Sequence, residues 1–281
     1  MTRLMLVAAA LVVLPVGAVA QQRPLRTDDA DLLAVGRVRA GLGFEFLQNQ
    51  RYSLSGLAGD LTRLGVASFQ VGVGEYAEFQ LSGVVQDFLT VKRRDPAVIP
   101  ATFAGNATSD VGDLVLAAKL RLASERRGRP ALAFKFAVEL PNASNESGLG
   151  NDETNFFATV ALSKKVGPAR VLGNLGLAIL GSPVTPNSQS DMLTYGAAVI
   201  VPVRRRVNLL AEVSGREGNE RIGNERRGEA RLGARIVAAG LRWDVAALAG
   251  LHRFDAASGV AFGVTYEAQA FHKPRSVKTV K

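Results

Sequence analysis

The chain has 281 residues, no cysteine and a formal net charge of +9. Without cysteine it has no disulfide, no thiolate metal ligand and no cysteine nucleophile. The basic residues cluster in short polar stretches without interleaved aromatic side chains (125–129, 164–165, 204–206 and 273–281), so the positive charge does not indicate a nucleic-acid-binding protein.

The first 20 residues have the pattern of a secretory signal peptide. Arg3 precedes an apolar run at 4–16, and Ala-Val-Ala stands before Gln21. The apolar run is shorter than the roughly 20 residues that a membrane helix needs. We therefore predict a signal peptide at 1–20, cleavage after Ala20, and a polar periplasmic lead-in at 21–36.

From residue 37 onward, apolar and polar positions alternate with a period of two. In 131–140, for example, Leu132, Phe134 and Phe136 alternate with positions that include Lys135 and Glu139. This period is typical of β-strands whose two faces lie in different environments. Twelve such segments follow one another, at 37–47, 63–73, 76–89, 112–122, 131–140, 154–164, 170–180, 192–201, 207–215, 229–237, 241–251 and 259–267.

The connections between these segments alternate between long and short along the chain. Outer-membrane barrels have this plan, with short periplasmic turns, longer external loops and an even number of strands. We therefore predict an all-β, up-and-down, 12-stranded antiparallel transmembrane β-barrel at 37–267, located in the bacterial outer membrane, and a basic tail at 268–281. A soluble β-protein is the alternative, because alternation alone does not tell which face contacts water.

Three segments resemble a known family. VGDLVLAAKLRL (111–122), AVELPNASNESGLGNDETNF (137–156) and ALSKKVG (161–167) resemble the outer-membrane β-barrel family named for the meta-cleavage pathway of phenol degradation. The resemblance covers about residues 111–215. It implies an outer-membrane barrel that passes small, often aromatic or hydrophobic, compounds.

The face that such a barrel turns inward carries both signs of charge. Paired charges in contact with water are tolerated at membrane depth, and they form either a selectivity lining or a ladder of ion pairs that fills the barrel. With Arg242, Asp113, Glu229 and Glu267 counted beside the candidates below, eight basic residues balance eight acidic ones, so we expect no strong selectivity for anions or cations. The lumen-lining candidates are Arg37, Arg39, Glu45, Glu78, Lys119, Arg121, Lys135, Glu139, Glu212, Arg231, Arg235 and Asp244.

Four apolar residues also fall on inward positions: Val84, Phe157, Ile200 and Leu210. Two roles are open for them. They either form an apolar constriction suited to an apolar solute, or pack against a plug or a folded-in loop.

No catalytic motif is present. The two histidines lack a neighbouring serine, and Gly-x-Ser-x-Gly, His-Glu-x-x-His and phosphate-binding glycine loops are absent from the sequence. We predict no enzyme activity, no cofactor and no metal.

The predicted function is a passive outer-membrane channel or transporter for small molecules. A non-conducting structural or adhesive barrel that acts through its long external loops is one alternative, and a soluble periplasmic protein that binds a small ligand is another. The expected partners are the lipid bilayer of the outer membrane, the barrel-assembly machinery and a small-molecule solute, with no nucleic acid.

Overall fold

The computed structural model describes residues 24–271, so the predicted signal peptide and the last ten residues of the basic tail lie outside the described range. Within that range, no helix is long and apolar enough to cross a membrane. The regular elements are strands: β1 (Arg37–Arg51), β2 (Leu57–Gly72), β3 (Ala77–Arg94), β4 (Ala107–Asp110), β5 (Leu114–Ala123), β6 (Ala131–Leu140), β7 (Asn155–Val166), β8 (Ala169–Gly181), β9 (Gln189–Arg204), β10 (Val207–Gly218), β11 (Arg227–Ala238), β12 (Leu241–Gly250) and β13 (Ser258–Gln269).

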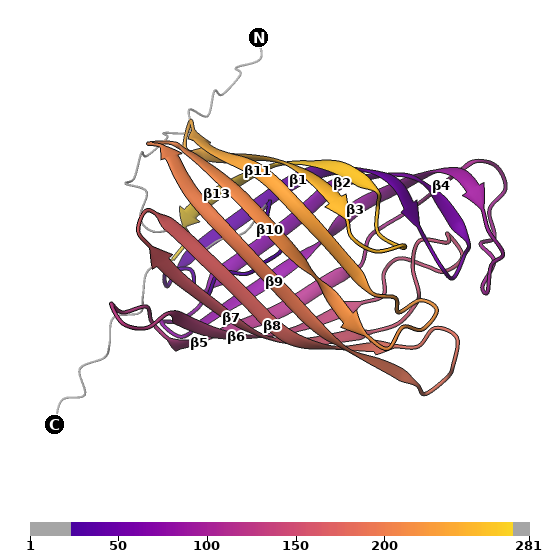
Figure 1. The fold of residues 1–281 in the computed structure, drawn as a ribbon, viewed down its shortest axis with the longest axis horizontal. Coiled ribbons are helices and arrows are strands. Elements are labelled where there is room, and N and C mark those ends of the chain that lie inside the picture. Colours follow the sequence, from indigo (N-terminus) through magenta and orange to yellow (C-terminus); the bar gives the residue numbers. More distant parts are fainter. Residues whose placement is uncertain (1–23, 272–281) are drawn as a thin grey trace, which may run out of the picture.

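The strands close into one barrel (Figure 1). Neighbouring strands pair antiparallel, and the first strand closes the ring by pairing with the last, from Arg37↔Gln269 to Gln48↔Ser258. Strand β3 pairs with β5 at residues 77–82 and with the short β4 at residues 87–90. The wall therefore has twelve strands, which confirms the predicted fold, and β4 is an additional strand within a connection that the sequence predicts to be a loop.

The outward face of the wall is apolar and the inward face is charged. In β11, Leu232 is 67% exposed, whereas the adjacent Arg231 is only 6% exposed. A soluble protein has the reverse arrangement. Exposed leucine beside covered arginine is expected where hydrocarbon surrounds a barrel and water or paired charge fills it.

Strands β2 and β3 change face halfway along their length. Gln70 is buried near one end of β2, whereas Arg63, at an odd position, turns inward nearer the other end and binds the buried Asp87 of β3. The change occurs at Gly65, where a φ of +64° and a register shift against β1 mark a β-bulge. The sequence predicts an uninterrupted alternation here, so Arg63 and Asp87 are not among the predicted lumen residues.

The two ends of the barrel differ in their connections. Strand β1 begins and β13 ends at the end with the short turns, which are 73–76, 124–130, 167–168, 205–206 and 239–240. The opposite end carries the long connections, together with β4 (Figure 1). In outer-membrane barrels the short turns face the periplasm, so the long connections face the cell exterior.

The outer connections pack together over the end of the barrel. The carbonyl of Leu54 accepts hydrogen bonds from the amides of Val98 and Ile99, at 2.9 and 3.0 Å, and Ser55 Oγ donates to the carbonyl of Gly148 at 2.8 Å. An apolar cluster supports them from below: Leu47, Leu57, Leu61, Leu89, Val91, Leu248 and Ala256. The outer loops therefore form a packed cover.

Candidate functional site

Residues 24–36, called the lumen segment below, lie inside the barrel. The sequence predicts a periplasmic lead-in at 21–36, but Leu25, Asp29 and Leu33 are buried against inward-facing side chains. The chain reverses from the lumen segment into β1 at Gly36, which has a φ of +77°. A Cβ atom there would lie 1.8 Å from the carbonyl oxygen of Phe271, so the reversal requires glycine.

Three aspartates bind the lumen segment to the wall. Asp29 is fully buried and accepts hydrogen bonds from Nε and Nη2 of Arg170, both at 2.6 Å. Asp31 binds the same guanidinium at 2.6 Å, and Asp28 accepts a hydrogen bond from Lys135 Nζ at 2.7 Å. Burial and the adjacent Asp29 raise the pKa of Asp31, although Arg170 opposes them. These charge-assisted contacts belong to the stronger class of hydrogen bond.

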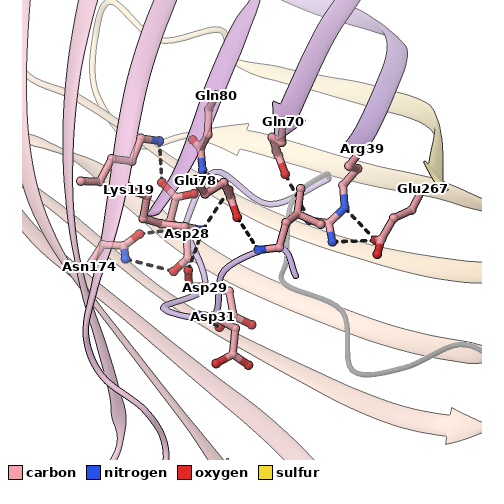
Figure 2. Close-up of polar contacts among 12 residues, drawn as sticks. Asp28, Asp29, Asp31, Arg39, Gln70, Glu78, Gln80, Lys119, Asn174 and Glu267 are labelled. Atoms are coloured by element: carbon pink, nitrogen blue, oxygen red, sulfur yellow. Dashed lines mark hydrogen bonds and ion pairs between the residues drawn. The ribbon is translucent and has the colours of Figure 1, made fainter. Parts of the chain in front are cut away.

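Carboxylates of the wall bind the backbone of the lumen segment in turn. The amide of Thr27 donates to Glu212, and the amide of Leu33 donates to Glu78 at 2.6 Å. Glu78 also lies 3.5 Å from Lys119 Nζ (Figure 2), and both side chains are buried. The predicted lumen residues Glu78, Lys119 and Glu212 thus satisfy polar groups of a buried backbone, which otherwise carry a large desolvation penalty.

Two of the four inward apolar candidates contact the lumen segment. Ile200 and Leu210 pack with its Leu25. Phe157 packs on Ala178, Leu180 and Met192 of the wall, and Val84 lines the space above the segment. Around the segment the wall carries small residues that leave room for it: Ala131, Ala133 and Ala161.

Ion pairs between neighbouring strands fill the periplasmic half of the lumen beside the segment. Arg37 and Arg39 both bind Glu267, at 2.7 and 2.8 Å. Arg39, which is 2% exposed, also donates to Gln70 at 3.2 Å (Figure 2). The two predicted arginines therefore join β1 to β13 at the seam of the barrel.

A second chain of ion pairs crosses β11, β1, β2 and β3. Glu45 lies 3.4 Å from both Arg231 and Arg63, and Arg63 lies 3.2 Å from Asp87. Arg231 also donates to the carbonyl of Pro24 at 2.7 Å. Arg63 and Asp87 face the lumen only because β2 and β3 change face at the bulge.

The remaining candidates are divided between lumen and rim. Glu139 accepts a hydrogen bond from Asn155 at 2.7 Å, and Arg235 lies directly opposite Asp244 in the β11–β12 ladder. Arg121 instead donates to a backbone carbonyl of the β2–β3 turn at 2.8 Å. Its guanidinium therefore contributes to the periplasmic rim.

A cavity of about 800 Å³ lies inside the barrel between the lumen segment and the outer loops. Pro24 and Arg26 of the lumen segment line one side. The wall combines apolar side chains, such as Phe157, with charged groups of both signs, among them the cations Arg216 and Arg227 and the carboxylates of Glu139 and Asp255. Such a chamber suits a small molecule that has both an apolar and a polar part.

The ladder pairing of β3 is interrupted between Ser82 and Asp87, where the amide of Gly112 donates to the carbonyl of Val84 at 2.9 Å. The β3–β5 ladder ends at Ser82↔Val115, and the β3–β4 ladder begins at Asp87↔Asp110. Beside this point, the outer face has an apolar groove of about 750 Å³. The groove and the inner cavity share lining residues: Ala67, Ser68, Leu81, Ser82, Gly83, Val84 and Gly112. The two spaces therefore approach each other where glycines take the place of larger side chains.

Within residues 24–271, no group of three or more acidic or histidine side chains is arranged to bind a metal ion. The chemistry of the lumen is that of ion pairs, hydroxyls and apolar contacts.

No family model and no curated protein matches the chain. Among solved structures, the COG4313 outer membrane channel from Pseudomonas putida F1 has a TM-score of 0.60 at 16% identity, over 85% of this chain and 98% of that chain. The chain has the fold of a bacterial outer-membrane β-barrel. The NanC porin (TM-score 0.49, 8% identity, 83% of this chain and 100% of that chain) and the translocator domain of the autotransporter NalP from Neisseria meningitidis (0.49, 15%, 84% and 90%) are also similar. The closed barrel and its apolar outward face place the chain in the outer membrane, where the bilayer contacts that face.

Proposed function

We propose that this outer-membrane barrel is a channel-like transporter that passes small apolar or aromatic molecules passively. The observation that carries the proposal is the approach of the outer apolar groove to the inner cavity where the ladder pairing of β3 is interrupted, around Gly83 and Gly112. The resemblance to the phenol meta-pathway family supports the same class of solute. A small-molecule solute and the barrel-assembly machinery are the partners we propose.

The groove suits an apolar molecule because its lining is apolar. Phe69, Val85 and Tyr266 line it on the face of the barrel that contacts hydrocarbon. A solute dissolved in the bilayer can reach this groove without entering water. Its movement therefore carries no free-energy cost for exposing apolar surface to water.

The lumen segment controls the way from the cavity to the periplasm. It borders the cavity at Pro24 and Arg26, and its aspartates bind Lys135 and Arg170. A solute in the cavity therefore leaves on the periplasmic side when these contacts separate or when it passes beside them.

The test is uptake of radiolabelled naphthalene by intact cells that express the protein. Gly83→Phe places an aromatic ring at the groove, where a Cβ atom meets Leu114 at 3.4 Å and the nearest backbone atom at 3.2 Å. Gly173→Phe is the matched control, because nothing lies within 4 Å of its Cβ position. We expect Gly83→Phe to at least halve the initial rate while Gly173→Phe keeps the wild-type rate.

Heat-modifiable migration on gels shows whether each variant is folded. If both folded variants took up naphthalene at the same rate, passage from the outer groove through the wall into the cavity would be contradicted. An uptake rate no higher than that of cells without the protein would contradict transport itself. An adhesive or structural barrel would give that second result and would lose its phenotype only when the outer loops are changed.

A further inference from the structure

The register of the wall aligns cations and hydroxyls in one continuous inward-facing row. Residues that face each other on adjacent strands have Cβ atoms about 5 Å apart, so their side chains form a connected surface. The row contains no acidic residue. Going from β5 to β11, its members are Lys119, Lys135, Thr159, Gly176, Thr194, Arg216 and Arg227, and it is called the cationic row below.

The periplasmic half of the cationic row already binds acidic groups. Lys135 holds the carboxylate of Asp28 at 2.7 Å. Lys119 Nζ lies 3.5 Å from Glu78 and donates to the carbonyl of Asp29 at 3.2 Å. The lumen segment thus uses this half of the row as a carboxylate-binding surface.

The cations in the outer half of the row have fewer contacts with carboxylates. Arg216 Nε donates to the carbonyl of Glu225, and the structure of residues 24–271 places no carboxylate within 4.0 Å of its guanidinium. The acidic group nearest to Arg227 is the carboxylate of Glu225 at 3.9 Å, which already accepts hydrogen bonds from Ser53 Oγ and the amide of Gly223. Arg216 therefore contacts Glu225 only through a backbone carbonyl, and Arg227 has only a distant contact with a carboxylate that is already bound elsewhere.

Two hydroxyl groups beside these arginines are unused. Thr194 faces Arg216 across the β9–β10 ladder, and Ser214 precedes Arg216 by two residues on the same face of β10. Both hydroxyl oxygens are buried, and neither has a hydrogen-bond partner in the part of the chain that the structure describes. Buried hydroxyls without partners are rare in folded proteins, and they indicate a missing ligand or water.

We infer that Arg216 and Arg227, with the hydroxyls of Thr194 and Ser214, bind the carboxylate of a small apolar monocarboxylate. A guanidinium presents paired N–H donors that match the two oxygens of a carboxylate. The apolar part of the ligand then lies in the same cavity, against side chains such as Phe157. This inference rests on the proposed function, because it names a solute class for the same lumen.

The continuity of the row connects this site to the lumen segment. A carboxylate ligand at Arg216 has the same chemistry as Asp28, which binds Lys135, three strand pairings beyond Thr194. A ligand that moves along the row therefore competes with Asp28 for Lys135. The solute and the lumen segment therefore compete for the same cations.

The test is binding of carboxyl-¹³C benzoate to the folded full chain in detergent micelles, followed by the carbon chemical shift. Neutral benzamide, of nearly the same shape, is the comparison ligand. We expect saturable binding of benzoate and at least about tenfold weaker binding of benzamide, which corresponds to about 1.4 kcal/mol. We expect the same loss of benzoate affinity in Arg216→Gln/Arg227→Gln. The control Arg205→Gln/Arg206→Gln removes two exposed arginines from the periplasmic rim and should bind benzoate like the wild type.

Equal binding of benzoate and benzamide by the wild type would overturn the inference, as would the absence of saturable benzoate binding. The inference would also be overturned if folded Arg216→Gln/Arg227→Gln bound benzoate as tightly as the wild type does. The comparison of the two ligands uses the unchanged protein, so it stands even if the double variant does not fold. Binding in micelles requires no transport, so the two proposals can fail separately. Benzoate binding without naphthalene uptake would contradict the proposed function alone. Naphthalene uptake without benzoate binding would contradict the inference alone.

Discussion

Removing two carboxylates from the lumen segment should release it from the wall. The perturbation is Asp28→Asn/Asp29→Asn, which keeps side-chain shape but removes the charges that bind Lys135 and Arg170. Both carboxylates lie well inside the barrel, with side chains 10% and 0% exposed. The isosteric change leaves the wall residues in place, so an effect can be attributed to these contacts.

The burial of the two ion pairs sets the free energy that the double variant should lose. Breaking a buried ion pair by removing one partner costs about 3–5 kcal/mol. Arg170 keeps its 2.6 Å contact with Asp31, so we take about 2 kcal/mol for the Asp29 contact. The partially exposed Lys135 supports about 1 kcal/mol for Asp28. The sum of about 3 kcal/mol raises the ratio of released to bound lumen segment by roughly 150-fold.

Two measurements report that ratio. Because the chain has no cysteine, Thr27→Cys provides a single thiol at a position that is 2% exposed, and its rate of maleimide labelling follows the released fraction. Conductance in planar bilayers should rise in the same variant. Asp31→Asn is the graded control, because the 36% exposed side chain of Asp31 supports an increase of only a few fold. If labelling and conductance in the folded double variant stayed at the wild-type level, the aspartates would not be what retains the segment.

Further predictions follow from other contacts. Leu25→Ala removes the apolar anchor of the lumen segment and should raise Thr27→Cys labelling by about tenfold or more, because such truncations cost about 2–5 kcal/mol, while Leu209→Ala on the lipid-facing side should leave it unchanged. Arg63→Gln leaves two inward carboxylates without their shared cation and should lower the free energy of unfolding in micelles by about 3 kcal/mol; an unchanged urea midpoint would contradict this. Burial would raise the pKa of Asp110, but hydrogen bonds from Ser144 outweigh it and hold the pKa below its usual value. This tether between outer loops is therefore present at neutral pH and lost as the pH falls through the lowered pKa, so the protection of the Ser144 amide against exchange, relative to its intrinsic rate, should hold at neutral pH, fall only below the usual pKa of a carboxyl group, and be lost at every pH in Asp110→Asn.

Most of the wall could be predicted because strand alternation reports directly on two environments. Leu232 and Arg231 lie on opposite faces in the sequence pattern and in the structure. The alternation does not report on irregularity in the backbone. Gly65 is the one local signal in β2 for a change of face, because a glycine within a strand pattern marks a bulge.

The position of the lumen segment could not be derived from periodicity, because the segment has none. Its signal is a matching of charge and size between distant parts of the chain. Asp28 and Asp29 find Lys135 and Arg170 more than a hundred residues away, and Ala133 and Ala161 provide the space. Such long-range contacts appear only once the strands are arranged in a ring.

Gly36 has a consequence for the order of assembly. It joins the lumen segment to β1, and β1 forms the seam with β13 that closes the ring. The segment also binds Lys119 of β5, Lys135 of β6 and Arg170 of β8, and β8 lies opposite that seam in the ring. Before closure, the segment can therefore act as an internal strut that draws the free edge of a curling sheet toward the opposite strands. The last pairing then forms around a core that is already in place, and nothing has to be threaded through a finished cylinder.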